Sequence, residues 1–212
     1  MKLDLGRGES VGMKGYFHSN QWLYLLILIS SAIALIASFT LSVDAWVLAA
    51  NPGAVLDCDI NSVISCSKVA NTWQANLLGF PNAYLGLMFE AVVLAVAAAG
   101  ISGVRFPRWY MLAAQLIYTI ALLFAWWLFF QSSFVIHSLC PWCLLITIFT
   151  SITFFSLLHI NIRDDNLFLP RPLQRAAEAM TRARFTEIGA VFLVLMVGVI
   201  VFSLYGLAVF GL

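Results

Sequence analysis

The chain has 212 residues, of which 62% are hydrophobic and only 10% charged, and its mean hydropathy is +0.95. This composition excludes a water-soluble globular protein. The net charge of +1 leaves neither a basic field that would hold nucleic acid nor an acidic solvating tail. We therefore expect an integral protein of the lipid bilayer that binds no nucleic acid.

Long uncharged stretches predict five membrane-spanning helices. The first contains the 29 residues between Lys14 and Asp44 that include no Asp, Glu, Lys or Arg, more than the ~20 residues that cross a hydrocarbon core. A cleavable signal peptide is the alternative for this stretch, but its apolar core would have only about 7 to 15 residues. The expected spans are about Trp22 to Val47, Pro81 to Ile101, Trp109 to Phe130, Pro141 to Ile160 and Ile188 to Leu212.

The third and fourth spans lie in one uncharged run of 54 residues, Trp109 to Ile162. Polar residues from Gln131 to Ser138 predict the break between them, and Pro141 suits the first turn of a new helix. Four aromatic residues crowd the end of the third span. These residues are Trp126, Trp127, Phe129 and Phe130. An aromatic belt at the membrane interface explains all four, and a place in the lining of a quinone pocket is the alternative for Trp127 and Phe130.

The distribution of Lys and Arg predicts the orientation of the chain, because short cytoplasmic loops retain these residues. With a cytoplasmic N-terminus, ten of the eleven basic residues lie inside and only Lys68 lies outside. All four cysteines and the C-terminus are then extracytoplasmic, at the cell membrane. We expect residues 1–20 to form a cytoplasmic tail and residues 21–212 to form a single all-α transmembrane domain with an extracytoplasmic cysteine loop.

The four cysteines form two close pairs, a pattern that predicts either disulfides or a four-thiolate metal site. On the oxidising side of a membrane disulfide chemistry is favoured, and no metal site is expected. Cys140 and Cys143 are three residues apart at the start of a helix, on one face, where a disulfide can open and close without refolding. The helix N-terminus favours a thiolate, and a staple of this spacing would add little stability. We infer a redox-active pair.

The other pair, Cys58 and Cys66, lies in the polar outer segment between Asp44 and Phe80. A fixed structural disulfide is one interpretation of this pair. The other is a relay, in which a loop pair meets a soluble partner and the helix pair meets an apolar oxidant, with exchange through mixed disulfides.

These residues resemble the bacterial form of the vitamin K epoxide reductase family. The resemblance covers about Trp22 to Ile160, and it is carried by Cys58-Asp59, by Cys66-Ser67-Lys68-Val69, by Gly79-Phe80-Pro81-Asn82 with Gly86, and by Leu139-Cys140-Pro141-Trp142-Cys143. It implies a helical bundle of four helices around a quinone, capped by the outer loop and a short amphipathic helix. It also implies the role of a DsbB counterpart, which reoxidises an exported DsbA-like thioredoxin-fold protein and supports disulfide formation.

The resemblance assigns roles to individual residues. Cys143 would face the quinone, menaquinone or ubiquinone, and Cys140 would exchange with the loop through Cys66. Cys58 would meet the protein partner, and Asn82 would offer its amide to a quinone oxygen, with a helix cap as the alternative. Further quinone contacts are expected at Thr147, Trp73 and Phe80, and minor roles at Asp59, Thr72, Glu90 and His137.

Two features depart from the family pattern. Animal members carry a Tyr where this chain has Thr147, which places epoxide reduction in doubt. Many bacterial members fuse a C-terminal thioredoxin domain, whereas the fifth predicted span of this chain reaches Leu212. We therefore expect no fused thioredoxin domain and a redox partner that acts in trans. The alternatives are a quinone-epoxide or vitamin K reductase, and a non-catalytic membrane protein with two inert disulfides that binds another protein.

Two polar residues near the spans also have competing interpretations. Glu90 is a carboxylate inside a span, eight residues after Asn82, where it either serves a proton path or is hydrogen-bonded to a neighbouring helix. His137 either accepts a proton from a thiol or is an exposed loop histidine.

The basic segment from Arg171 to Arg184 predicts an amphipathic stretch on the inner membrane surface.

Overall fold

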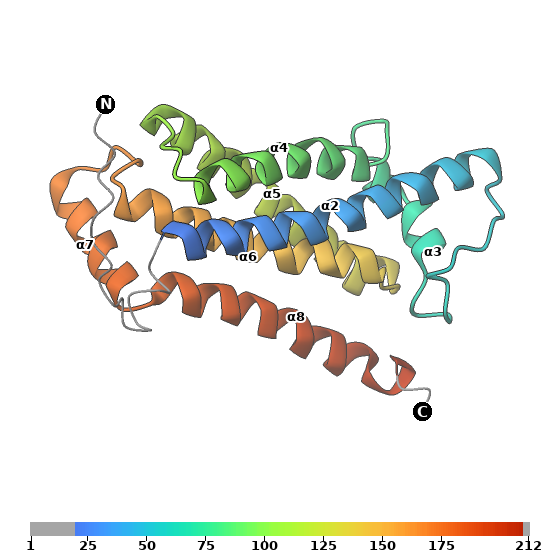
Figure 1. Ribbon diagram of the computed structural model, residues 1–212. Helices are drawn as coiled ribbons and strands as arrows, with labels where there is room; N and C mark the ends of the chain where they lie inside the picture. Colours follow the sequence, from blue (N-terminus) through green and yellow to red (C-terminus); the bar gives the residue numbers. More distant parts are fainter. Residues whose placement is uncertain (1–19, 210–212) are drawn as a thin grey trace.

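The computed structural model describes residues 20–209, and this part of the chain is all-helical (Figure 1). Five of its helices are long and apolar enough to cross a membrane, as predicted. The five are α2 (Asn20–Ala50), α4 (Ala83–Ile101), α5 (Arg108–Phe130), α6 (Pro141–Arg163) and α8 (Phe185–Val209). The shorter elements are α3 (Cys66–Ala70), the 3-10 turn η1 (Trp73–Asn76), the π-helical turn η2 (Gln131–Ile136) and α7 (Arg171–Arg182). The predicted tail, residues 1–20, lies outside the described residues except for Asn20, and residues 210–212 of the fifth predicted span also lie outside them.

The break between the third and fourth spans is shorter than predicted. Instead of turning at Gln131, the chain continues as η2 to Ile136 and reverses at His137, whose φ of 53° is left-handed. The physical reason is that the polar residues expected to face water are buried and bonded internally. Ser132 donates its hydroxyl to the carbonyl of Ser138, and the N–H of Ser138 donates to the carbonyl of Ser132 at 3.2 Å.

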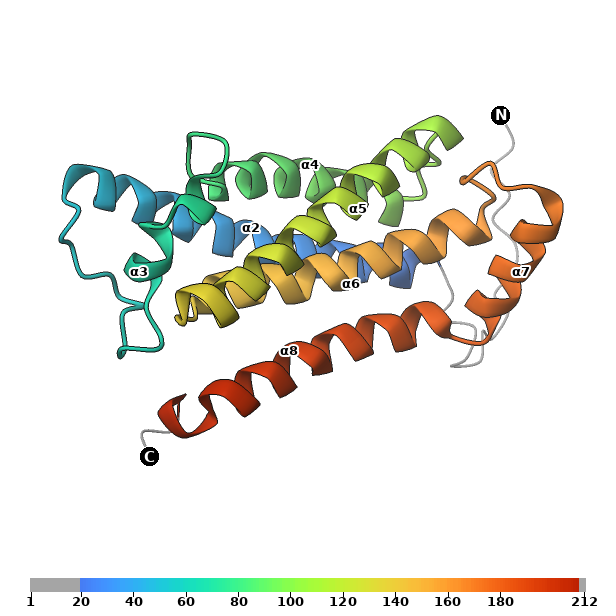
Figure 2. The same cartoon turned by 180° about the vertical axis from the view of Figure 1, so that it is seen from behind.

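Helices α2 and α6 hold the bundle together. α2 packs against α4 and α6, α5 packs against α6, and α8 runs along α6 on one side of the molecule, as both views show (Figures 1 and 2). The α2–α4 contact is close because small residues line it, as is common between membrane helices. A Cβ atom added at Gly86 would lie 2.3 Å from Ser38 Oγ, and one added at Gly100 would lie 2.5 Å from the ring of Tyr24.

The aromatic residues at the end of α5 do not all form an interfacial belt. Trp126 and Phe129 are buried in a cluster with Val197 of α8. The indole N–H of Trp126 donates to Ser151 Oγ of α6 at 3.2 Å. These two side chains therefore join α5, α6 and α8, because their rings face neighbouring helices. Phe130 is exposed, as the belt interpretation expects.

The two ends of the bundle differ in charge. Within residues 20–209, Lys68 lies at the end that carries the cysteines, whereas the seven arginines lie at the other. There, Arg108 pairs with Asp165 at 3.1 Å and lies over the ring of Phe168. The predicted amphipathic segment is observed as α7, and it connects α6 to α8 across this end.

The close α2–α4 contact gives a test of the packing. We expect Gly100→Ala to lower the stability of the detergent-solubilised protein by about 1 to 3 kcal/mol, because the new methyl group displaces the buried ring of Tyr24. Gly198→Ala is the matched control, since nothing lies within 4 Å of the added Cβ. Thermal unfolding followed by tryptophan fluorescence measures both. Equal melting temperatures for the two variants would contradict the contact.

Candidate functional site

The first pair of cysteines forms a disulfide in the loop that follows α2. Cys58 and Cys66 are bonded, with their Cα atoms 5.7 Å apart. Both are buried, in an apolar cluster with Leu48 of α2 and Leu56 of the loop. Cys66 begins the short helix α3, whose N-cap is Ser65. The disulfide therefore packs against one end of the bundle and is not free in solvent.

The second pair begins α6. Cys140 is the N-cap residue, and its Sγ accepts a hydrogen bond from the backbone N–H of Cys143 at 3.4 Å. Pro141 occupies the first turn, as the sequence predicts, where its missing N–H costs nothing. Cys140 and Cys143 are both free thiols in this structure, Cys140 buried and Cys143 half-buried.

The two pairs meet at one point. Cys140 Sγ lies 3.5 Å from Cys66 Sγ. Backbone contacts hold this approach: Leu139 N–H donates to the carbonyl of Val63 at 2.7 Å, and Ser65 N–H donates to the carbonyl of Leu139 at 3.0 Å. They form a short parallel bridge between Ile64 and Leu139. A free thiol thus faces a disulfide sulfur at a distance that one exchange step can close.

The surroundings of Cys140 favour its ionised form. A hydrogen bond from the Cys143 thiol, with further bonds from the backbone N–H groups of Cys143 and Trp142, lowers the pKa of Cys140. Burial and the charge of Asp44 act in the opposite direction and are outweighed. A thiol of lowered pKa is both a ready nucleophile and a good leaving group.

Asp59 organises the cysteine loop. Its carboxylate accepts hydrogen bonds from the Ser65 hydroxyl at 2.7 Å, from Ser67 N–H at 3.0 Å and from Leu56 N–H at 2.8 Å. Partial burial works to raise the pKa of Asp59, but these hydrogen bonds together lower it to about 2. The side chain therefore connects the segment before Cys58 to the start of α3.

Asn82 lies beside η1. It occupies the N-cap position of α4, but its side chain makes no capping hydrogen bond, so the predicted side-chain cap is not observed. Instead, Asn82 Nδ2 donates to the carbonyl of Gln74 in η1 at 2.7 Å. Asn82 Oδ1 is buried and has no hydrogen-bond partner among the described residues. An unsatisfied buried acceptor of this kind suits a ligand O–H.

The comparisons with known proteins can be set beside this geometry. The model of the vitamin K epoxide reductase family matches residues 25–158, which is 134 of the 212 residues. The chain belongs to the vitamin K epoxide reductase family. A comparison with curated proteins found no match. Members of this family are oxidoreductases, and the family is linked to quinones and to disulfide chemistry in membranes.

The other residues expected at or near a quinone site of this family are Thr147 in α6 and three residues in or near η1, called here the η1 group: Thr72, Trp73 and Phe80. Trp73 of η1 contacts Trp127 of α5, with ring centroids 6.1 Å apart, and is otherwise largely exposed, as is Phe80. Thr147 is buried in α6, where its hydroxyl donates to the carbonyl of Cys143 at 2.9 Å. Thr72 Oγ1 donates to the carbonyl of Val69. No hydrogen bond or ring contact within residues 20–209 joins the η1 group directly to Cys143.

Glu90 and His137 make no hydrogen bond to a cysteine that the described part of the chain shows. Glu90 is buried in α4 and accepts a hydrogen bond from the hydroxyl of Tyr118 in α5 at 3.1 Å. This is the hydrogen bond to a neighbouring helix that the second interpretation expects. His137 is exposed in the left-handed turn before α6, as expected of a loop histidine.

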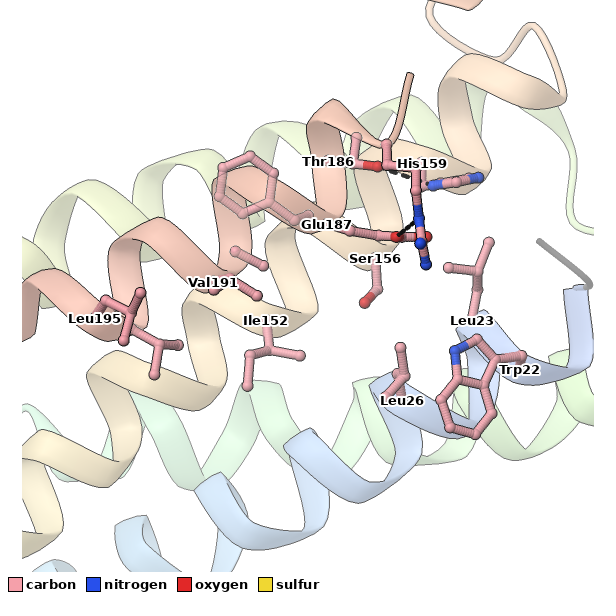
Figure 3. A pocket seen from close by; sticks show the side chains of 14 residues that line it. Trp22, Leu23, Leu26, Ile152, Ser156, His159, Thr186, Glu187, Val191 and Leu195 are labelled. Atoms are coloured by element: carbon pink, nitrogen blue, oxygen red, sulfur yellow. Dashed lines mark hydrogen bonds and ion pairs between the residues drawn. The ribbon is translucent and has the colours of Figure 1, made fainter. Parts of the chain in front are cut away.

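A cavity of about 420 Å³ lies between α2, α6 and α8 (Figure 3). Apolar side chains line most of it, and an ion pair between Arg184 and Glu187 lies at one end. Its nearest lining residue on α6 is Ile152, nine positions, or about 14 Å of helix, beyond Cys143. This cavity therefore does not serve the cysteines of this vitamin K epoxide reductase homologue.

Sequence reasoning missed one residue at the site. Asp44, near the end of α2, has its Oδ2 atom 3.9 Å from Cys58 Sγ. It is the one charged residue between Lys14 and Asp57, and that isolation in an apolar segment was the available signal. A charge in such a position is costly and calls for a functional explanation.

The 3.5 Å approach of Cys66 and Cys140 gives a direct test. In the double variant Cys58→Ala, Cys143→Ala, we expect the two remaining thiols to form a disulfide nearly quantitatively under mild oxidation, because their sulfurs are already in contact. The matched control, Cys58→Ala, Cys140→Ala, leaves Cys66 with Cys143 and should cross-link much less. Alkylation followed by mass spectrometry measures both. Equal cross-linking would mean that Cys140 is not the partner of Cys66.

Asp59 gives a second test. We expect Asp59→Ala to weaken the loop by roughly 1 to 3 kcal/mol, because two backbone N–H groups and the Ser65 hydroxyl lose a charged acceptor. The loop disulfide should then be reduced faster by dithiothreitol, whereas the exposed neighbour Asp57→Ala should have little effect. Since the pKa of Asp59 is lowered to about 2, its contribution is present at neutral pH and is lost only as pH falls through that value. An unchanged reduction rate in Asp59→Ala would refute the role.

Proposed function

We propose that this protein is a membrane thiol–disulfide oxidoreductase that takes two electrons from the dithiol of an exported DsbA-like thioredoxin-fold protein and delivers them to a membrane quinone, in support of disulfide formation. The observation that carries the proposal is the 3.5 Å contact between Cys140 Sγ and Cys66 Sγ. It places a free thiol of the helix pair against the disulfide of the loop pair, where electrons can pass in either direction.

The proposed cycle begins at the loop. A thiolate of the partner attacks Cys58 Sγ, Cys66 leaves, and the second partner thiol completes the exchange, so that the partner becomes a disulfide and the loop a dithiol. Cys66 then attacks Cys140 Sγ of an oxidised Cys140–Cys143 pair, and Cys143 leaves. Finally Cys58 attacks Cys66, the loop disulfide closes, and Cys140 leaves. Two electrons have then moved from the loop to the helix.

In the proposed cycle, the bonding of the cysteines in this structure is the one expected after this transfer. The loop pair is a disulfide, and Cys140 and Cys143 are free. In this state the helix pair holds the electrons, and the loop is ready for another molecule of the reduced partner. Both sulfurs of the loop are buried, however. The loop must therefore move away from Leu48 and Cys140 to admit the partner thiolate.

A quinone would accept two electrons and two protons from the Cys140–Cys143 dithiol. Cys143 is the half-buried member of the pair and is proposed to face it. Asn82 is proposed to hold its head group, because Oδ1 is a buried acceptor without a partner and suits the O–H of a reduced quinone. One N–H of Asn82 is already bonded to Gln74, which fixes the orientation of the amide.

The distribution of charge supports the proposed orientation. The arginines of the described chain lie at the end opposite the cysteines, and the positive-inside tendency therefore favours an orientation in which the cysteines are on the extracytoplasmic side of the cell membrane. Disulfides persist on that side. An exported thiol protein acting in trans would therefore meet the loop directly.

Two alternatives are less well supported. Reduction of a quinone epoxide, as in vitamin K metabolism, would benefit from a free hydroxyl donor near Cys143, but the Thr147 hydroxyl is bonded to the backbone of its own helix. A non-catalytic protein with inert disulfides would keep its pairs apart, whereas here a free thiol touches a disulfide sulfur.

Two substitutions test the proposed order. We expect Cys143→Ala to abolish quinone reduction, a loss of at least 100-fold, because no disulfide can then close with Cys140. We expect Cys58→Ala to retain quinone reduction driven by dithiothreitol and to lose it with a reduced thioredoxin-fold partner. Anaerobic quinone absorbance measures both.

The control is the unsubstituted protein with each reductant. If Cys58→Ala were fully active with the protein partner, the loop relay would be wrong. If the unsubstituted protein reduced no quinone although its cysteines were shown to cycle, the quinone acceptor would be wrong.

A further inference from the structure

Asp44 is placed to act on Cys58. Its Oδ2 atom lies 3.9 Å from Cys58 Sγ. The carboxylate oxygen and the sulfurs of Cys58 and Cys66 all lie within 4.8 Å of one another. Asp44 belongs to α2, whereas the disulfide belongs to the loop, so the approach is a tertiary contact rather than a consequence of sequence neighbours.

Cys58 needs help to become a nucleophile. When the loop is a dithiol, Cys58 must attack Cys66 as a thiolate. Its side chain is only 9% exposed and lies in an apolar cluster. Its two sequence neighbours, Asp57 and Asp59, are both acidic. Burial and nearby negative charge both disfavour a thiolate, so the attack requires a group that takes the proton away.

The other carboxylates nearby are unsuited to this task. Asp59 is occupied by three hydrogen bonds that hold the loop together. Asp57 is exposed to solvent. Asp44 is half-buried, and within residues 20–209 no Lys or Arg pairs with it. Its free oxygen faces the sulfur that must lose the proton.

We propose that Asp44 is the general base that accepts the Cys58 proton when Cys58 attacks Cys66 and closes the loop disulfide. This rests on the proposed function and deepens it. The step balances: the Cys58 S–H bond and the Cys66–Cys140 disulfide break, and the Cys58–Cys66 disulfide and the Asp44 O–H bond form. The electron pair leaves on Cys140 as a thiolate. In the reverse direction the Asp44 carboxyl protonates the departing Cys58.

The groups that face this centre are few. Asp57 and Asp59 of the loop act on Asp44 by their charge, and Asp44 in turn acts on Cys140 at the start of α6. Lys68 of α3 is exposed. A pH dependence of loop closure therefore reports Asp44, Cys58 and these neighbours, and a substitution at Asp44 separates its contribution from theirs.

The test is a single-turnover measurement on the full chain in detergent, with EDTA present throughout. The protein with all four thiols reduced is mixed anaerobically with a short-chain ubiquinone. Acid quenching, alkylation and mass spectrometry follow the closure of Cys58–Cys66, while absorbance follows the quinone. The variants are Asp44→Asn, Asp44→Glu and, as the matched acidic control, Asp57→Asn.

We expect Asp44→Asn to slow loop closure at pH 6.5 by about 100-fold or more, the contribution typical of general base catalysis. The deficit should shrink as the pH is raised, because hydroxide then removes the Cys58 proton without help from a carboxylate. Asp44→Glu should restore much of the rate. Asp57→Asn removes a nearby negative charge but no base, so it should close the loop at least as fast as the unsubstituted protein. The first phase of quinone reduction, from Cys140 and Cys143, should not be slowed in any variant, because the charge of Asp44 opposes the Cys140 thiolate.

The opposite result is equally clear. If Asp44 acted only through its negative charge, its removal would favour the Cys58 thiolate, and Asp44→Asn would close the loop faster. A faster or unchanged rate at pH 6.5 overturns the proposal while leaving the relay intact. Absence of quinone reduction in the unsubstituted protein would instead overturn the proposed function itself.

Discussion

The short backbone bridge between the cysteine loop and the start of α6 is the constraint on which the site depends. Leu139 N–H donates to Val63, and Leu139 accepts from Ser65 N–H. Leu139 directly precedes Cys140, and Ser65 directly precedes Cys66. A disulfide exchange requires sulfur atoms in contact, and these two bonds fix the backbones that carry them. Ser138 adds a third bond, from its hydroxyl to the carbonyl of Val63 at 3.1 Å. Without the bridge, no backbone hydrogen bond of Leu139 would hold Cys66 beside the N-terminus of α6.

The bridge depends in turn on how α5 ends. The π-helical turn and the left-handed residue His137 bring Ser138 and Leu139 back over the bundle, so that Leu139 is oriented toward the loop. Buried backbone groups in this turn must be satisfied. Ser132 and Ser138 bond to each other, and Tyr205 of α8 donates its hydroxyl to the carbonyl of Ser133 at 2.5 Å. The fifth helix therefore does more than anchor the chain, because it supports the turn that positions Cys140.

The sequence predicts much of this architecture and little of its contacts. Long stretches without charged residues predict the five spans, because a helix that crosses a bilayer needs such a stretch. Pro141 correctly predicts the start of α6. The turn before α6 is shorter than the polar stretch from Gln131 to Ser138 predicts. Serines normally face water, but here Ser132 and Ser138 bond to each other inside the protein. The sequence does not predict the contact of Asp44 with Cys58 for a similar reason: the two residues are 14 positions apart, beyond any helical spacing. Asn82 was found through the family pattern, but the choice between a helix cap and a free acceptor required coordinates.

For the proposed relay, the surroundings of the four cysteines favour electron flow from the loop pair to the helix pair. Hydrogen bonds at the N-terminus of α6 lower the pKa of Cys140, so Cys140 departs readily from a mixed disulfide with Cys66. Cys58 is buried and has acidic neighbours, and both features disfavour its thiolate. A thiolate that does form there is a strong nucleophile. Closure of the loop disulfide therefore converts an unfavourable thiolate on Cys58 into a favourable one on Cys140. If Asp44 accepts that proton, the carboxylate and the helix end act on the same step from its two sides: one makes the nucleophile, and the other stabilises the leaving group.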